Sequence, residues 1–235
     1  MLSRTQTSNA NRRRQQRPST LTLRQQIEAR IREKASPAVW TANDFLDLGS
    51  RDAVDKALQR LTKTQQIRRI DRGLYDMPSL NRLTGRKTVP DYKAVIEAVA
   101  RRDQARILID GITAANELGL TDAVPAQVVV HTDARLKPIK LGNLVIRFKL
   151  TAPSRLYWAG RPAMRIVQAL HWLHDMLPEN RDSIVRRLAK ILGGEDSKSI
   201  RDDLEKGLHA LPSWMQDLVR DLLARDKQAI PPHRV

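Results

Sequence analysis

Eight polar and charged side chains recur at helical spacing between residues 50 and 63, and their types match the groups that read nucleic-acid bases. Arg and Lys donate hydrogen bonds to guanine, Gln pairs with adenine, and Asp accepts from the amino group of cytosine. A helix that carries such groups on its solvent side has the width of the DNA major groove. We therefore predict a DNA-facing set that consists of Ser50, Arg51, Asp52, Asp55, Lys56, Gln59, Arg60 and Lys63.

The two acidic members of this set, Asp52 and Asp55, are unexpected on a surface that faces phosphates. They fit a sequence-specific reader, in which an acid accepts from cytosine or rejects wrong sequences. The alternative is structural, because an acid near the start of a helix interacts favourably with the helix dipole. The sequence leaves both interpretations open.

An apolar stripe predicts the helix that positions these side chains. Apolar residues recur at i, i+3, i+4 and i+7, which indicates an amphipathic helix over Arg51–Lys63. Ser50 is placed to cap its N-terminus, and we expect Gly49 to adopt the left-handed conformation in the preceding turn. A shorter helix over residues 42–48 would lead into that turn. The stripe is made up of Val54, Ala57, Leu58 and Leu61.

Two β-rich runs after this helix predict a basic hairpin. Residues 66–70 and 74–77 flank Asp71-Arg72-Gly73, where glycine would supply a positive φ. With a first helix that begins at Leu23 and a short strand after it, the order is that of a winged helix-turn-helix, assigned here to residues 21–78. The hairpin side chains expected to contact phosphates or the minor groove are Arg68, Arg69 and Arg72.

Residues 1–20 are polar, rich in Arg and free of acidic residues. We predict a disordered basic arm whose arginines enter an adjacent minor groove. The segment lacks the apolar core of a secretory signal and the periodicity of an amphipathic presequence, although its composition is also that of a transit peptide. The other alternative is a solubility tail on a winged helix that binds protein. The arginines of this arm are Arg12, Arg13, Arg14 and Arg17.

The positive charge of the chain is concentrated in its first third. The 235 residues carry a formal net charge of +16. Residues 1–89 hold 19 Lys and Arg against 8 Asp and Glu, a net of +11, and residues 90–235 hold 23 against 18, a net of +5. This field favours a polyanionic partner, double-stranded DNA before an anionic membrane, over a generic basic surface. Without cysteines or a membrane-spanning apolar run, we expect a cytoplasmic protein.

The rest of the chain predicts a second domain of mixed α/β type, so that the whole is α+β. Residues 79–90 have the Gly, Pro and basic content of a linker, the domain follows at 91–228, and residues 229–235 form a tail. A small sheet is expected from strands at 107–109, 127–132, around Ile139 and at 144–150, with helices at 91–102 and 112–118. A helical part is expected over 161–176, 180–192, 197–207 and 213–228, with breaks at Pro178, Gly193-Gly194 and Pro212.

Basic residues gather around two strands of this small sheet. Over residues 144–150 the apolar Leu144, Ile146, Phe148 and Leu150 alternate with other types, which predicts one buried and one basic face. The basic face would extend a DNA footprint or bind RNA, and the alternative is a solvated strand surface. The members of this possible second basic surface are Lys137, Lys140, Arg147 and Lys149.

No motif of the chain indicates catalysis, a cofactor or a metal. His171 and His174 share one helix face, but no third ligand is indicated and H-E-x-x-H does not occur. Gly193-Gly194 lacks the Lys-Ser/Thr of a phosphate loop, and neither Ser154 nor Ser213 stands in a G-x-S-x-G context. We therefore expect a protein that is not an enzyme. A nucleic-acid-modifying enzyme would need an acidic or metal cluster that the sequence does not indicate.

Short motifs follow one another in a set order across both predicted domains. In the first they are Trp40-Thr41-Ala42-Asn43-Asp44-Phe45, Leu48-Gly49-Ser50 and Arg72-Gly73-Leu74-Tyr75. In the second they are Val89-Pro90-Asp91-Tyr92, Gly111, Ala114-Ala115-Asn116, Leu118-Gly119-Leu120, Val124-Pro125, Ile139-Lys140-Leu141-Gly142-Asn143 and Val145-Ile146-Arg147-Phe148-Lys149. In this order and spacing the chain, from about residue 24 to 228, resembles the AbiEi-like antitoxins of bacterial type IV toxin–antitoxin systems.

The resemblance implies a two-domain antitoxin encoded beside a nucleotidyltransferase-like toxin. Its winged helix would bind inverted repeats in its own promoter and repress the operon. Its C-terminal domain would counter the toxin, typically without a stable complex. The sequence offers no obvious dimerisation helix, so we expect a monomer in solution, two copies of which meet on an inverted repeat. The alternative is a winged-helix transcriptional regulator whose C-terminal domain binds a protein or ligand, with no toxin partner.

Overall fold

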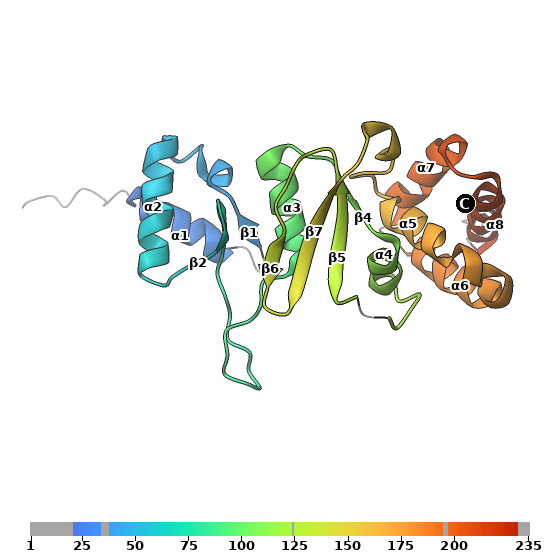
Figure 1. Cartoon of the computed structure of the whole chain (residues 1–235), viewed down its shortest axis with the longest axis horizontal. Coiled ribbons are helices and arrows are strands. Elements are labelled where there is room, and N and C mark those ends of the chain that lie inside the picture. Colours follow the sequence, from blue (N-terminus) through green and yellow to red (C-terminus); the bar gives the residue numbers. More distant parts are fainter. Residues whose placement is uncertain (1–20, 34–37, 124, 195–196, 230–235) are drawn as a thin grey trace, which may run out of the picture.

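A computed structural model describes residues 21–33, 38–123, 125–194 and 197–229. The elements succeed one another along the long axis of the molecule, from a small N-terminal unit through a central sheet to a group of helices (Figure 1). The class is α+β, with small sheets and several helices, as predicted. Within the described residues, no helix is both long enough and apolar enough to cross a lipid bilayer.

The N-terminal unit packs two helices against a three-stranded sheet. It contains α1 (Leu23–Glu33), β1 (Val39–Trp40), the 3-10 helix η1 (Ala42–Phe45), α2 (Arg51–Lys63), β2 (Arg68–Asp71) and β3 (Leu74–Asp76). The strand order is β1-β3-β2, and both pairings are antiparallel. Ile27 of α1, Phe45 of η1 and the apolar stripe of α2 belong to one buried cluster. Burial of that stripe directs the polar face of α2 outward.

The predicted helix over Arg51–Lys63 is confirmed, but the role predicted for Gly49 is wrong. Ser50 caps α2, because its Oγ accepts a hydrogen bond from the Ala53 amide at 3.4 Å. Gly49 does not have a positive φ. A Cβ at this position would lie 3.2 Å from Cδ2 of Leu23, so the side chain of Leu23 in α1 packs close to Gly49. The predicted helix over 42–48 is a single 3-10 turn, whereas Gly73 has the expected positive φ of 70°.

Helix α3 (Tyr92–Asp103) lies between the N-terminal unit and the central sheet (Figure 1). Its buried face belongs to the same apolar cluster as Val39 of β1, Leu74 of β3 and the central strands. Nη2 of Arg101 donates to the carbonyl of Val39 at 3.0 Å. Nη1 of Arg102 donates to the carbonyl of Arg72 at 2.5 Å. The two predicted domains therefore share a hydrophobic core.

The central sheet has four strands in the order β4-β5-β7-β6. Its elements are β4 (Ile107–Ile109), α4 (Gly111–Glu117), β5 (Gln127–Thr132), β6 (Ile139–Leu141) and β7 (Leu144–Leu150). Strands β5 and β7 run parallel, and the other pairs are antiparallel. The alternation predicted for β7 holds in part: Ile146 is buried, but Leu150, the last residue of the strand, is exposed. The buried residues of α3 are Val95, Ile96, Ala98 and Val99.

Helices form the C-terminal end of the molecule, as predicted. They are η2 (Pro153–Arg155), α5 (Met164–Leu173), η3 (His174–Met176), α6 (Leu177–Leu192), α7 (Lys198–Gly207), η5 (Leu208–Ala210) and α8 (Ser213–Ala229). The sequence predicts a helix break at Pro178, but this residue lies in the first turn of α6. A helix tolerates proline there, because the backbone N–H that proline lacks would have no partner within the helix. Gly111 lets α4 approach α5, because a Cβ there would lie 2.5 Å from Cβ of Trp172.

Candidate nucleic-acid interface

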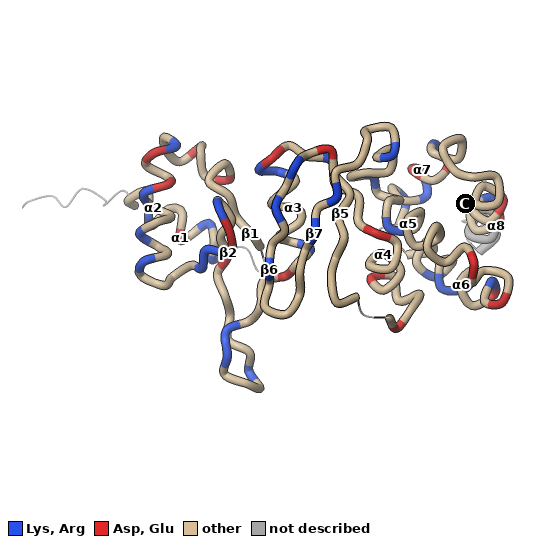
Figure 2. Tube along the Cα trace, viewed as in Figure 1, with Lys and Arg blue, Asp and Glu red and all other residues tan. Residues whose placement is uncertain are grey.

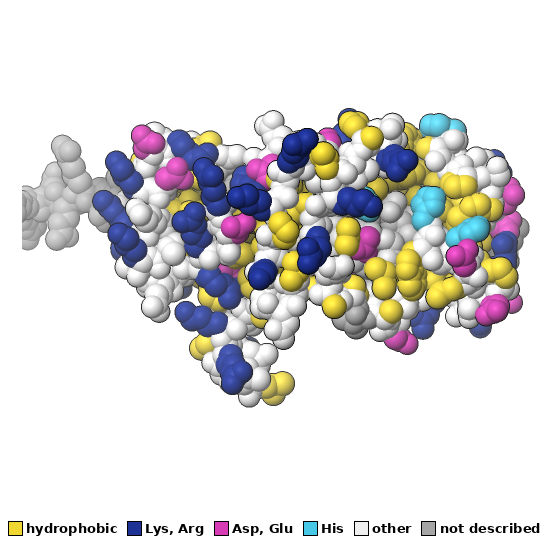
Figure 3. Space-filling model, in the orientation of Figure 1, with side chains coloured by type: hydrophobic (Ala, Val, Ile, Leu, Met, Phe, Trp, Pro, Cys, Tyr) yellow, Lys and Arg dark blue, Asp and Glu magenta, His cyan; other side chains and the backbone are white. Residues whose placement is uncertain are grey.

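The outer face of α2 carries the predicted set, and all eight of its side chains are exposed. The opposite face, with Val54, Leu58 and Leu61, is fully buried against α1 and η1. In the space-filling view, Lys and Arg side chains cover much of the N-terminal unit on the face shown (Figure 3). Residue type and helix orientation thus produce a polar, largely basic ridge open to solvent.

Arg51 and Asp55 of this ridge form a pair with each other. Nε of Arg51 donates to Oδ2 of Asp55 at 3.0 Å, one helical turn away. Nη1 of Arg51 donates to the side-chain oxygen of Asn43 at 3.0 Å, which lies in η1. Asp55 and Asn43 together orient the Arg51 side chain between α2 and η1. Asn43 belongs to the motif of residues 40–45, but its sequence context does not predict a role at the ridge.

Four side chains of the same face, Lys56, Gln59, Arg60 and Lys63, are exposed and make no hydrogen bond or ion pair with another described residue. They occupy successive turns of α2 in its middle and C-terminal half. Three of the four are cations. A ligand can therefore bind these donors without breaking a contact among the described residues.

Arg68 has internal partners that the sequence does not predict. Its Nε and Nη2 donate to the two carboxylate oxygens of Asp76, at 2.9 and 2.5 Å, and its Nη1 donates to the Thr88 carbonyl at 2.9 Å. The Asp76 side chain is only 9% exposed. These donors hold β2, β3 and the following loop together, and contact of Arg68 with phosphates stays a prediction. A bidentate pair of this kind fixes geometry strongly.

Arg69 and Arg72 remain exposed on the hairpin of β2 and β3, as predicted. Arg72 occupies the turn, and its carbonyl accepts the hydrogen bond from Arg102 of α3. The tip of the hairpin is therefore attached to the body of the protein. The arginines predicted in the N-terminal arm, Arg12, Arg13, Arg14 and Arg17, lie outside the described residues.

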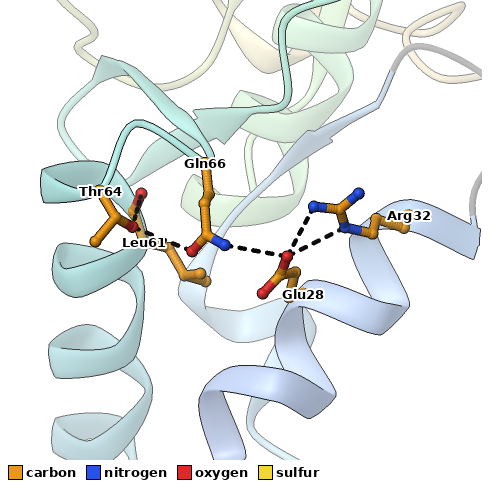
Figure 4. A network of polar contacts seen from close by, with 5 residues as sticks. All are labelled: Glu28, Arg32, Leu61, Thr64 and Gln66. Atoms are coloured by element: carbon orange, nitrogen blue, oxygen red, sulfur yellow. Dashed lines mark hydrogen bonds and ion pairs between the residues drawn. The ribbon is translucent and has the colours of Figure 1, made fainter.

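A polar network fixes the turn that follows α2 (Figure 4). Oε1 of Glu28 in α1 accepts hydrogen bonds from Nη2 of Arg32 at 2.8 Å and from Nε2 of Gln66 at 3.2 Å. Oε1 of Gln66 accepts from the Thr64 hydroxyl at 3.1 Å. Gln65, between them, has a positive φ of 57°. The network links α1 to the start of β2 and so sets the hairpin relative to α2.

The second basic surface lies on the central sheet, on the face that α3 does not cover. Val128, Val130 and Ile146 face α3, and the residues that alternate with them point the other way. Nε of Arg147 donates to the Gln127 side chain at 2.7 Å across β5 and β7. The four predicted cations, which are all exposed, are Lys137, Lys140, Arg147 and Lys149.

Cations of the two basic surfaces are visible from one side of the molecule. Figure 2 shows Lys and Arg along α2, along the loop that hangs below β2, and on the strands of the central sheet. In Figure 3, basic side chains over these same parts are on the viewed face, whereas the C-terminal helices there show mostly apolar, His and uncharged side chains. The basic side chains of the N-terminal unit and of the central sheet therefore lie on one face of the molecule (Figure 3).

The sequence of this chain matches the model of one protein family. The model of DUF6088, described as a family of unknown function, matches residues 26–200. The chain belongs to the DUF6088 family. Among solved structures, the crystal structure of the RV2827C protein from Mycobacterium tuberculosis is similar to it, with a TM-score of 0.39 and 18% identity over 88% of this chain and 80% of that chain. No curated protein matches the sequence.

The DUF6088 match includes α2, the hairpin, the central sheet and the helices as far as Ile200 in α7. Both basic surfaces therefore lie inside the extent of the family model. The N-terminal arm, residues 1–20, and helix α8 lie outside it. The family description adds no ligand and no reaction to the geometry.

A cavity of about 380 Å³ lies between α3 and the start of α5 in this DUF6088 chain. Ile96, Ile107 and Met164 give it apolar walls. At its edge the Glu117 carboxylate, whose side chain is 4% exposed, accepts hydrogen bonds from the Tyr92 hydroxyl and from Nε of Arg165, both at 2.6 Å. Burial, together with this carboxylate, raises the pKa of Tyr92.

The two histidines that share a helix face pack against an aromatic ring. The ring centroids of His174 and Trp214 are 4.4 Å apart, and those of His171 and Trp214 are 6.3 Å apart. Nδ1 of His174 lies 3.1 Å from a carboxylate oxygen of Asp175. Burial lowers the pKa of His171, and the neighbouring His174 lowers it further. In the described part of the chain, no three His, Asp or Glu side chains form a group able to hold a metal ion.

Proposed function

We propose that this protein binds double-stranded promoter DNA through α2 and represses its own operon, and that it is the antitoxin of a type IV toxin–antitoxin system. The observation that carries the DNA-binding half is the outer face of α2, where Lys56, Gln59, Arg60 and Lys63 are exposed and without a partner among the described residues. These are donor types that contact bases and phosphates in a major groove.

The arrangement of the N-terminal unit supports a winged helix-turn-helix. Two helical segments, η1 and α2, meet at the turn before Ser50, and a hairpin of β2 and β3 follows. In this interpretation α2 enters the major groove, while Arg69 and Arg72 of the hairpin contact phosphates beside it. The arrangement of Arg51 on Asp55 supports a role for this acid in presenting the arginine to a base.

The basic face of the central sheet offers a second contact in the same proposal. Arg147 and Lys149 are exposed on β7, and Lys140 is exposed on the neighbouring β6. They would extend the footprint on the duplex beyond the N-terminal unit. The alternative ligand for this surface is RNA, which a protein that counters a nucleotidyltransferase-like toxin would meet beside the substrate of that toxin.

The antitoxin half of the proposal is supported by the resemblance to AbiEi-like antitoxins. It implies a functional partner, a nucleotidyltransferase-like toxin encoded next to this protein, that is countered without a stable complex. Two monomers would meet on an inverted repeat of the promoter in the cytoplasm. Neither half of the proposal requires a cofactor or an enzymatic activity of this chain.

A transcriptional regulator with a ligand-binding C-terminal domain and no toxin partner is the second candidate. The cavity of about 380 Å³ between α3 and α5 favours it, because cavities of this size hold small molecules in other proteins. Since α3 also contacts the hairpin through Arg102, a ligand there would be placed to affect DNA binding.

A repression assay in cells tests the DNA-binding half. A reporter gene under the protein's own upstream region is expressed with the wild type, with the Lys56→Ala, Gln59→Ala double variant, or with Lys190→Ala, which removes an exposed cation from α6. We expect the wild type and Lys190→Ala to repress and the double variant to lose repression. Equal repression by all three proteins would contradict the proposed role of α2.

Co-expression with the neighbouring gene tests the antitoxin half. If that gene encodes a nucleotidyltransferase and arrests growth, the full chain is expected to restore growth. The Lys56→Ala, Gln59→Ala variant, expressed from an unrelated promoter, should restore growth as well, because the resemblance assigns neutralisation to the C-terminal domain. Growth arrest that the wild type does not relieve would leave only the regulator interpretation.

A further inference from the structure

Residues 79–88, predicted as part of a linker, fold back on themselves as a projecting hairpin. The Thr88 amide donates to the Ser79 carbonyl and the Asn81 amide to the Arg86 carbonyl, both at 2.8 Å. The Asn81 side chain accepts from two amides of the turn, and Gly85 has a positive φ of 65°. The loop hangs away from the body between β3 and α3 (Figure 1). We call residues 79–88 the basic hairpin.

The root of the basic hairpin is fixed to the proposed DNA-binding unit. Arg68 of β2 donates one hydrogen bond to the Thr88 carbonyl at 2.9 Å and one to each carboxylate oxygen of Asp76 in β3. The hydroxyls of Ser79 and Thr88 are 3.3 Å apart across the root. The basic hairpin is therefore oriented by the same strands that follow α2.

Its composition is unusual for a connecting segment. It carries three cations, Arg82, Arg86 and Lys87, and the sequence has no acidic residue between Asp76 and Asp91. It also exposes two leucines, Leu80 at 65% and Leu83 at 96%. A single exposed leucine needs no explanation. Here, however, Leu83 stands beside the tip of an ordered arm between cations, where it stabilises nothing in the protein itself.

This combination matches the chemistry of proteins that enter a minor groove. Such proteins neutralise the two phosphate strands with Arg and Lys and insert an apolar side chain at a base step, which kinks the duplex. Residues 79–81 pair with 86–88, and the turn between these two segments carries Leu83 at the end of the arm.

We propose that the basic hairpin binds the minor groove of double-stranded DNA beside the major groove that α2 occupies, with Leu83 inserted at a base step. Arg82, Arg86 and Lys87 contact the flanking phosphates. The inference rests on the proposed DNA binding by α2 and adds a second site with a different ligand geometry. Duplex DNA is the partner because the cations surround Leu83 and the basic hairpin contains no acidic residue.

Fluorescence titrations of a duplex from the protein's own upstream region test the proposal with the full chain. In the Arg82→Ala, Arg86→Ala, Lys87→Ala variant, we expect the slope of log K against log salt to fall by about two to three and the affinity to fall about tenfold or more. The matched control, Lys190→Ala, should change neither. All four residues are exposed, so thermal unfolding should be unchanged.

Leu83→Ala tests the insertion separately. We expect it to keep the salt slope, because the substitution removes no charge, and to abolish the bend that energy transfer between dyes at the two duplex ends reports in the wild-type complex. Leu80→Ala, an exposed leucine nearer the root, should keep the bend. A wild-type complex without a bend, or a bend that survives Leu83→Ala, would overturn the insertion.

The outcomes also separate this inference from the proposed function. If the Lys56→Ala, Gln59→Ala variant loses binding while the triple variant keeps the affinity, slope and bend, the inference fails and the proposed function stands. This result is also the one expected if the basic hairpin contacts a protein or a lipid surface. If the wild type does not bind the upstream duplex more tightly than a scrambled one, the proposed function fails first.

Discussion

Arg68 and Asp76 stand opposite each other on β2 and β3, and the arginine holds both oxygens of the carboxylate. Its third hydrogen bond reaches the Thr88 carbonyl at the root of the basic hairpin. A single side chain thus joins the strand after α2, its neighbour and the projecting arm. Arg68 therefore holds these segments together, whereas the neighbouring Arg69 is exposed to solvent.

We predict that Arg68→Ala destabilises the protein by about 2 kcal/mol, because it leaves the buried Asp76 carboxylate without its charged partner. Arg69→Ala, one residue further along the same strand, should change the free energy of unfolding by less than about 0.5 kcal/mol. Urea unfolding of both variants provides the measurement. If the two variants are equally stable and only Arg68→Ala weakens DNA binding, Arg68 contacts phosphate after all.

A second prediction concerns the pair of Arg51 and Asp55. Asp55→Ala removes one of the two partners of Arg51, so the arginine side chain should adopt more than one orientation. We expect the ratio of affinities for the upstream duplex and a scrambled duplex to fall about tenfold, the value of one base contact. The stability of the protein should hardly change, since the pair is exposed.

Asp52→Ala is the matched control for that prediction. Asp52 is an exposed acid in the first turn of α2, and its side chain makes no hydrogen bond or ion pair with another described residue. Its removal should raise affinity for both duplexes alike by reducing repulsion of phosphates. Equal effects of the two substitutions on the affinity ratio would show that Asp55 does not act through Arg51.

A third prediction follows from Tyr92, whose pKa is raised above its ordinary value of 10.0 by burial and by the Glu117 carboxylate. The folded state keeps the phenolic proton to higher pH than the unfolded state. The resulting contribution to stability is complete below about pH 10 and is lost as pH rises toward the folded pKa. Wild type should therefore exceed Tyr92→Phe in free energy of unfolding by an amount that shrinks above about pH 10. A difference that is independent of alkaline pH would contradict this assignment.

A fourth prediction concerns the second basic surface. Reversing two charges with Arg147→Glu and Lys149→Glu should reduce both the affinity for the upstream duplex and the salt slope, by about one for each phosphate that is no longer neutralised. Both side chains are exposed on β7, so the fold should persist. Unchanged affinity and slope would show that DNA does not bind this surface. The same variant, titrated with a single-stranded RNA, then shows whether the RNA alternative holds.

Local patterns predicted the parts of the interface that depend on one element. The stripe of Val54, Leu58 and Leu61 fixes which side of α2 is buried, so the exposed set on its other side was predicted from periodicity alone. The Ser50 cap and the positive φ of Gly73 were likewise predicted, because cap and turn preferences are local. These features need no knowledge of what packs against them.

The features that were missed depend on contacts between elements. The partner of Arg68 lies on the neighbouring strand, and only the register of β2 and β3 brings Asp76 opposite it. Gly49 is constrained by Leu23 of α1, which lies far from it in sequence. Residues 79–90 have the composition of a linker. That composition does not predict the hydrogen bonds by which the Asn81 side chain folds the segment back. Asn81 and Gly85 were the available signals of a turn.

The central claim is that the outer face of α2 reads the promoter of this protein's own gene. Its most direct test is a titration of the full chain against the upstream duplex and a scrambled duplex at two salt concentrations, for wild type and for Lys56→Ala, Gln59→Ala. We predict that the wild type prefers the upstream duplex by at least about a thousandfold and that the double variant loses most of this preference. Equal affinity of the wild type for both duplexes, or an unchanged preference in the variant, would contradict the claim.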